Sequence, residues 1–136
     1  MKTYQPRRTV FKFTDLEVYQ QTLACSVIIV KNLRPALAKL KYPFLEGMVN
    51  CSMTAPLLIG EAHSLRFSDH ARALLLLERA MADCNKLVVY LEQARSIYGS
   101  KLDQDLVDDL SRRYTDVRGK IFRLEKAWQK FTPPKQ

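Results

Sequence analysis

The clearest chemical pattern in this 136-residue chain is a set of regularly spaced cations. Arg72, Arg79 and Lys86 recur every seven residues, so on a helix they follow one stripe. A second set falls within about 60° of azimuth on a later helix, and it consists of Arg112, Arg123, Lys126 and Lys130. A single surface charge is usually only solvated, whereas a stripe on a chain of formal net charge +8 favours phosphate binding. These residues are the candidate nucleic-acid contacts.

Few aromatic residues interleave with these cations, and the sequence contains no motif known to read base edges. Phosphate contacts position a protein on nucleic acid but carry no sequence information. We therefore expect binding to RNA or DNA that is sensitive to salt and only weakly dependent on nucleotide sequence.

Patterns for catalysis or metal binding are weak by comparison. Glu61 and His63 do not form the H-E-x-x-H motif of a zinc protease, and a helix start is expected between His63 and His70. No phosphate loop, dinucleotide fingerprint or G-x-S-x-G motif occurs. An enzyme that uses Glu61 and His63 stays open as a third hypothesis, but we expect a protein without catalytic activity, metal or cofactor.

Composition indicates a globular, cytosolic protein. Hydrophobic residues make up 47% of the chain and charged residues 26%. No apolar run approaches the roughly 20 residues of a membrane span, and the basic N-terminus is not followed by the apolar core of a signal peptide. The cysteines are odd in number and scattered, which favours buried free thiols at Cys25, Cys51 and Cys84.

Four helices account for most of the chain. Apolar periodicity and capping residues predict helices over about residues 14–40, 43–64, 69–98 and 103–131. Pro35 should bend or end the first helix, and Pro56 should kink the second. The short links between the helices predict an up-down antiparallel four-helix bundle over residues 14–131. The bundle would follow a basic tail, residues 1–13, and precede a C-terminal tail, residues 132–136.

The stretch ARALLLLERA, residues 71–80, carries more leucines than one buried face can use. The spacing of Leu74, Leu77, Met81, Cys84, Val88 and Leu91 predicts the buried face of that helix. Leaving a large apolar side chain in water costs about 1.5–3 kcal/mol relative to burial. Residues 27–30 pose the same problem in the first helix, where the expected buried face includes Leu23 and Val27. We therefore predict self-association, or else tolerated surface leucines, with subunit contacts at Val27, Ile28, Ile29, Leu75 and Leu76.

Two segments also resemble a bacterial four-helix-bundle family. FTDLEVYQQT, residues 13–22, is similar to the F-x-D-L-x-V-[WY]-Q start of that family. Residues 51–94 resemble its second signature, in which a helix with serine and proline leads to an N-I-A-E-G-like segment, a polar link and a long helix; residues 58–62 read LIGEA here. The family includes proteins encoded in intervening sequences of 23S rRNA genes and the accessory variability determinants of diversity-generating retroelements. The resemblance covers residues 13–131.

The resemblance implies a homopentameric barrel with a positively charged surface and pore. It also implies that nucleic acid and a reverse transcriptase are partners, because the retroelement members bind both. On this basis we expect a basic, homo-oligomeric accessory protein that binds nucleic acid and assists a reverse transcriptase. The alternative is an oligomeric scaffold that docks an acidic protein partner. The residues do not choose between the two branches of the family.

Overall fold

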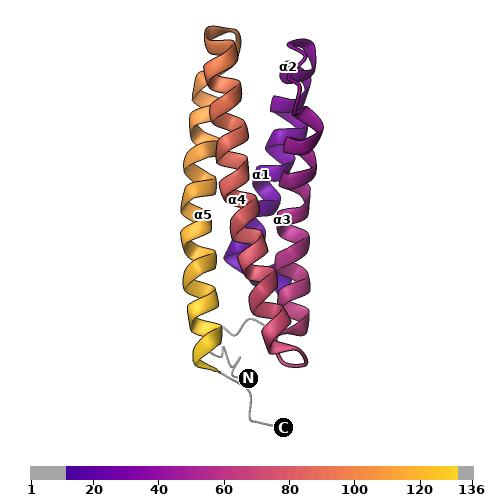
Figure 1. Cartoon of the computed structure of the whole chain (residues 1–136), viewed down its shortest axis with the longest axis vertical. Helices are drawn as coiled ribbons and strands as arrows, with labels where there is room; N and C mark the ends of the chain where they lie inside the picture. The colour runs from indigo at the N-terminus through magenta and orange to yellow at the C-terminus, as the bar shows by residue number, and fades with distance from the viewer. Residues whose placement is uncertain (1–11, 132–136) are drawn as a thin grey trace, which may run out of the picture.

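The computed structural model describes residues 12–131, and every secondary-structure element within that range is helical. Four long rods run alternately up and down, which confirms the predicted helical bundle (Figure 1). The elements are η1 (Phe13–Asp15), α1 (Glu17–Ile28), η2 (Ile29–Leu33), α2 (Arg34–Lys39), α3 (Leu45–Leu65), α4 (His70–Tyr98), η3 (Gly99–Lys101) and α5 (Gln104–Lys130). Within this described part, no helix is both long and apolar enough to cross a membrane.

The four rods have two diagonal pairs. The first rod, built from α1, η2 and α2, packs against α3 and α5, and α4 packs against the same two helices. The first rod and α4 are therefore diagonal partners. Surfaces on α1 and α4 cannot merge into one patch within a single chain, because α3 or α5 lies between them.

The first rod changes its helical type where a bend was expected. Residues Ile29–Leu33 form a π-helical segment, and Pro35 lies in the first turn of α2. Proline has no N–H to donate and its ring crowds the carbonyl four residues earlier, so the widened turn accommodates it. Pro56 is buried inside α3, which continues as a helix on both sides of it.

Three of the predicted helix ends are confirmed. The Asp69 side chain accepts a hydrogen bond from the backbone N–H of Arg72 at 3.2 Å and caps α4. Asp103 caps α5 in the same way through the N–H of Leu106 at 3.1 Å. Gly99 ends α4 with a φ of 53°, which favours glycine.

The predicted start of the first helix is wrong. The sequence placed that start at about residue 14, but Thr14 and Asp15 belong to the 3-10 turn η1, and α1 begins at Glu17. Phe13, placed in the basic tail by the sequence, packs edge-on against Tyr19 with ring centroids 5.1 Å apart. The rest of the predicted tails, residues 1–11 and 132–136, lies outside the described residues.

The buried face of α4 is rotated from the one predicted. Leu74, Met81 and Val88 are only half-buried. The fully buried positions are Ala73, Leu76, Leu77, Ala80, Cys84, Leu87, Leu91 and Ala94. Three of these are alanines, whose small side chains let α4 approach its neighbours closely. Because alanine is only weakly hydrophobic, a pattern of large apolar residues in the sequence does not reveal this buried face.

The buried face of α1 also differs from the prediction, because it includes hydroxyl groups. Thr22 and Ser26 are buried, and their hydroxyls donate to the carbonyls of Val18 at 2.8 Å and Leu23 at 2.7 Å. Each hydroxyl is satisfied within its own helix, so burial leaves neither of these two groups without a partner. Leu23 and Val27 consequently point outward, 41% and 43% exposed.

The expected subunit contacts are corrected by this packing. Ile29 and Leu76 are core residues, so they cannot contact another subunit as the sequence suggested. Val27 and Leu75 are exposed and Ile28 is half-buried. Because α1 and α4 are diagonal, Val27 and Leu75 belong to separate surfaces rather than to one patch.

The rotated face of α4 can be tested with neighbouring leucines. Leu76→Ala should lower the free energy of unfolding by about 2–4 kcal/mol, because it removes packed methyl groups from the core. Leu75→Ala, at a position 49% exposed, should cost less than about 1 kcal/mol. Urea unfolding of both variants measures the difference, and equal costs would contradict the observed face of α4.

Candidate nucleic-acid interface

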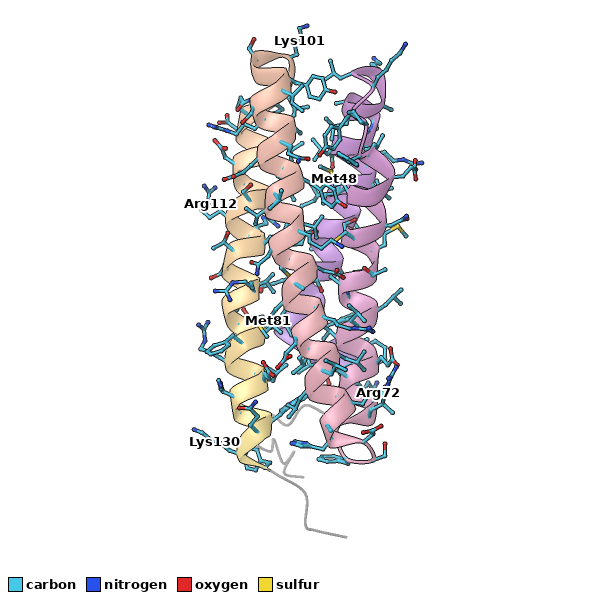
Figure 2. The ribbon with its side chains drawn as sticks, in the orientation of Figure 1. Met48, Arg72, Met81, Lys101, Arg112 and Lys130 are labelled. Atoms are coloured by element: carbon cyan, nitrogen blue, oxygen red, sulfur yellow. The ribbon has the colours of Figure 1, made fainter. Side chains whose placement is uncertain are left out.

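Helix α5 is the most amphipathic of the long helices. Its buried side carries Val107, Leu110, Tyr114, Val117 and Ile121. The opposite side carries the predicted cations, all four of them exposed, and we call this set the α5 ridge: Arg112, Arg123, Lys126 and Lys130. Arg112 and Lys130 lie along the outer edge of the molecule, about 27 Å apart by helical rise (Figure 2). The structure therefore brings this second predicted set together.

Most of the charge on the α5 ridge is not neutralised within the chain. Arg112 lies 3.5 Å from the Asp109 carboxylate, at long range for an ion pair, and Asp109 pairs more closely with Arg113 at 2.9 Å. In residues 12–131, no carboxylate pairs with Arg123, Lys126 or Lys130. Three neighbouring cations remain available to phosphate groups.

Lys120 has a different role from the ridge. Its ammonium lies 2.7 Å from the Glu17 carboxylate on α1 and 3.4 Å from Asp116. The hydrogen bond to Glu17 raises the pKa of Lys120 above its ordinary value. This cation ties α5 to α1, so we do not count it among the phosphate contacts.

The first predicted set lies on another side of the molecule. Arg72 is 3.5 Å from the Glu61 carboxylate of α3, so this stripe of Arg72, Arg79 and Lys86 follows the flank of α4 that faces α3. Asp83 belongs to the same flank and accepts a hydrogen bond from Thr54 of α3 at 2.8 Å. Figure 2 shows Arg72 and the labelled ridge residues at opposite edges of the bundle. The two sets therefore do not form one continuous surface in a single chain.

Aromatic side chains next to cations are the feature that the sequence analysis missed. The Lys126 ammonium lies 5.1 Å from the centre of the Phe122 ring, one helical turn away. The Arg66 guanidinium lies 4.3 Å from the centre of the Phe67 ring in the link between α3 and α4. The signals in the sequence are a cation four residues after a phenylalanine on one helix and a cation directly before a phenylalanine in a link.

A buried carboxyl group lies on α5 between the ridge and the core. Glu125 is 4% exposed, and burial raises its pKa to about 7, with a further contribution from a hydrogen bond to Glu78. Near neutral pH this carboxyl holds a proton part of the time. It therefore adds less negative charge beside Lys126 than a solvated glutamate would.

The residues of the enzyme hypothesis are not brought together. Glu61 is exposed and pairs with Arg72, whereas His63 is buried, with its ring centroid 6.4 Å from that of Trp128. Within the described range, no group of three or more histidine, cysteine or acidic side chains could hold a metal ion.

The cysteines behave as predicted, since all three are buried and free. Burial raises the pKa of Cys25 to about 11 and the pKa values of Cys51 and Cys84 to about 12. All three thiols are therefore protonated near neutral pH, the form that is neither nucleophilic nor metal-binding.

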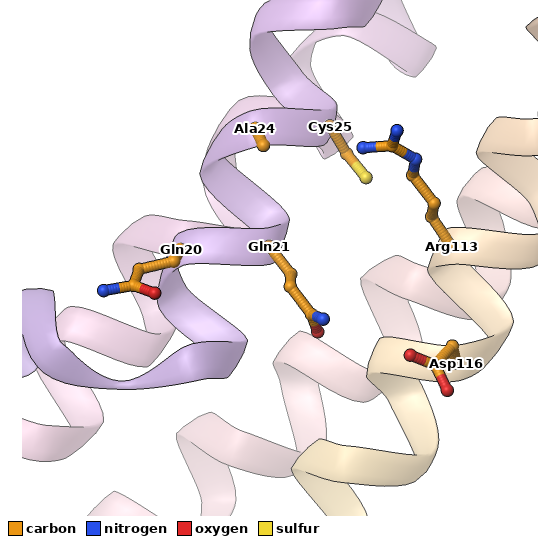
Figure 3. A pocket seen from close by; sticks show the side chains of 6 residues that line it. All are labelled: Gln20, Gln21, Ala24, Cys25, Arg113 and Asp116. Atoms are coloured by element: carbon orange, nitrogen blue, oxygen red, sulfur yellow. The ribbon is translucent and has the colours of Figure 1, made fainter.

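A small pocket of about 280 Å³ opens between α1 and α5 (Figure 3). Its lining residues are Gln20, Gln21, Ala24, Cys25, Arg113 and Asp116. Arg113 and Asp116 already have ion-pair partners in Asp109 and Lys120, and the Cys25 thiol is protonated. The pocket therefore lacks a free charge or a nucleophile, and the α5 ridge is the stronger candidate site.

Comparison with known proteins gives no further guide, since no protein family, curated protein or solved structure matches the chain.

The buried Glu125 carboxyl predicts how stability depends on pH. Its pKa rises from 4.5 to about 7 on folding, so the folded state binds the proton more tightly. The free energy of unfolding should therefore fall as pH rises from about 4.5 to about 7. Glu125→Gln cannot ionise, so relative to the parent it should gain about 1–2 kcal/mol between pH 5 and pH 8.

Urea unfolding at both pH values measures this gain. The matched control is Glu92→Gln, the same substitution at an exposed glutamate in the C-terminal half of α4, where burial cannot hold a proton. A Glu125→Gln variant that follows the pH dependence of the parent would show that Glu125 is not held protonated by burial.

Proposed function

We propose that this chain is a cytoplasmic, non-catalytic accessory protein that binds nucleic acid through phosphate contacts on the α5 ridge. The observation that carries the proposal is the set of exposed cations on the outward face of α5, of which Arg123, Lys126 and Lys130 have no carboxylate partner in the described part of the chain. Three cations without a carboxylate partner, on one rigid helix, contribute little to the stability of the chain. They can instead bind the phosphates of a polyanion.

The shape of the α5 ridge also supports a polyanion as its ligand. A row of about 27 Å matches roughly eight base pairs of duplex or a comparable length of single strand. Each phosphate that a protein cation neutralises releases its counterions and so adds a salt-dependent term to binding. Helix α5 supplies such cations already aligned. The set on α4 lies on another side of the bundle, so we assign Arg72, Arg79 and Lys86 a secondary contribution.

Self-association is the second part of the proposal. Apolar side chains are exposed on the adjacent helices α1 and α3, and we call them the α1–α3 face: Leu23, Val27, Met53 and Leu57. Leu57 is 70% exposed and lines a groove of about 210 Å³ between the two helices. Exposed apolar surface of this kind is typical of an interface between subunits. Leu75 on the diagonal helix would belong to a second contact surface, as a closed ring requires.

The resemblance to retroelement accessory proteins extends the proposal to a pentamer that assists a reverse transcriptase. Five chains of net charge +8 would carry 5 × 8 = +40, which would concentrate positive potential on the particle. The apolar α1–α3 face is what supports the oligomer, and the α5 ridge is what supports the nucleic acid. An acidic protein partner is the competing outcome of the experiment below.

Neutralising the α5 ridge should weaken nucleic-acid binding in a salt-dependent way. Arg123→Gln/Lys126→Gln/Lys130→Gln lowers the net charge to 8 − 3 = +5. It should reduce the slope of log K against log salt by about 2–3 for a DNA duplex. Fluorescence anisotropy with unrelated RNA and DNA sequences between 50 and 200 mM salt, roughly the range over which such contacts weaken, measures the slope.

The matched control is Lys31→Gln/Lys39→Gln/Lys101→Gln, which removes the same charge from exposed positions outside the ridge. We expect a change in slope of less than about 1 for this control. Equal slopes for the two variants would remove the ridge as the contact site. A parent protein that binds neither RNA nor DNA would contradict the proposed function and favour the scaffold.

A further inference from the structure

One end of the bundle exposes two aromatic rings beside cations. Phe67 lies in the link between α3 and α4, and Phe131 follows the last residue of α5; both are at the lower end of the bundle in Figure 1. They are 78% and 75% exposed, more than any other large apolar side chain in residues 12–131. Neither ring contributes to the core, so their exposure is a cost that packing within the chain does not explain.

Phe67 has a cation over its ring, and Phe131 directly follows a cation in the sequence. The Arg66 guanidinium covers one side of Phe67 at 4.3 Å, and a hydrogen bond of 2.6 Å from Arg66 to the carbonyl of His63 holds it in place. Lys130, the last cation of the α5 ridge, immediately precedes Phe131. One helical turn before Lys130, Lys126 lies over the Phe122 ring.

We call these residues the aromatic end: Arg66, Phe67, Phe122, Lys126, Lys130 and Phe131. An aromatic ring offers a flat apolar surface on which an unpaired base can stack, and a neighbouring cation can hold the adjoining phosphate. Bases inside a duplex are already stacked on each other and do not present their faces. Rings combined with cations therefore suit a single strand, whereas cations alone suit duplex and single strand equally.

We propose that the aromatic end binds a single strand of nucleic acid, with bases stacked on Phe67 and Phe131 while its backbone continues along the α5 ridge. This inference rests on the proposed function and adds the class of ligand to it. Stacking does not depend on base identity or on the sugar, so RNA and DNA strands should bind alike.

The dimensions of the bundle agree with a short strand. Helices that pack against each other are about 8–10 Å apart. Phe67 adjoins α4 and Phe131 ends α5, so roughly one or two such spacings separate the two rings. A strand of a few nucleotides spans that distance, at the lower limit of about 4–16 nucleotides that single-strand modules cover.

The experiment compares a labelled 20-nucleotide single strand with the duplex of the same sequence, as RNA and as DNA, by fluorescence anisotropy at low salt. The test variant is Phe67→Ala/Phe131→Ala, whose positions are exposed and therefore should not disturb folding. The matched control is Phe44→Ala, which removes a ring that is 58% exposed at the opposite end of the bundle. Phe67→Leu keeps an apolar side chain but removes the stacking surface.

We expect the parent to prefer the single strand by about tenfold or more, and the double variant to lose about tenfold or more in single-strand affinity, since each stacked base contributes measurably. The salt slope and the duplex affinity should change little. Phe67→Leu should also lose single-strand affinity, although less than the double variant does, and Phe44→Ala should bind as the parent.

Two results would overturn this inference while leaving the proposed function intact. One is that the parent binds the single strand and the duplex with equal affinity and that the double variant binds the single strand as tightly as the parent does. The other is an effect of Phe67→Ala/Phe131→Ala on the mass of the particle instead of on strand affinity, which would make the rings a subunit contact. A parent that binds no nucleic acid would contradict the proposed function itself.

Discussion

The close packing of α4 between α3 and α5 is the contact on which the other surfaces depend. Ala73, Ala80 and Ala94 give α4 a narrow buried face, and Leu76, Leu77 and Leu87 fill the space beside it. That face determines which side chains α4 turns outward. Arg72, Arg79 and Lys86 follow the flank toward α3. Leu76, Leu77 and Cys84 enter the core, whereas Leu75 faces water. With α4 fixed in this way, α5 is left with one side against the core and one side entirely in water, and that outer side carries the ridge.

The class of fold could be predicted from the sequence, because helix ends and apolar periodicity are local properties. Asp69, Gly99 and Asp103 act through hydrogen bonds and φ angles within a few residues of themselves. The buried faces of α1 and α4 could not be predicted in the same way. Alanine carries little apolar signal, and Thr22 and Ser26 become acceptable in the core only because their hydroxyls bond to their own helix. The diagonal relation of α1 and α4 is a property of the packed bundle.

The candidate site likewise has one part that the sequence predicts and one part that only the packed bundle reveals. The α5 ridge was visible as a repeat, since Arg112, Arg123 and Lys130 return to nearly the same azimuth of one uninterrupted helix. The aromatic end could not be predicted, because Phe67 and Phe131 lie 64 positions apart in sequence and come to the same end of the bundle only when α3, α4 and α5 are packed. Leu75 and Leu76 show the same limit: adjacent in sequence, one faces water and the other the core.

The surfaces of the bundle thus have different chemistry on different sides, with an apolar α1–α3 face, a cationic α5 ridge and an aromatic end. This separation would let the proposed self-association and the proposed nucleic-acid binding occur together, since neither surface covers the other. The absolute mass by light scattering, for the parent and for Leu57→Glu, alone and with a short single-stranded RNA at low salt, tests this account most directly. It predicts that the parent is a multiple of the 15.8 kDa chain that gains mass with RNA, and that Leu57→Glu is smaller. A monomeric parent whose mass does not change with RNA would contradict it.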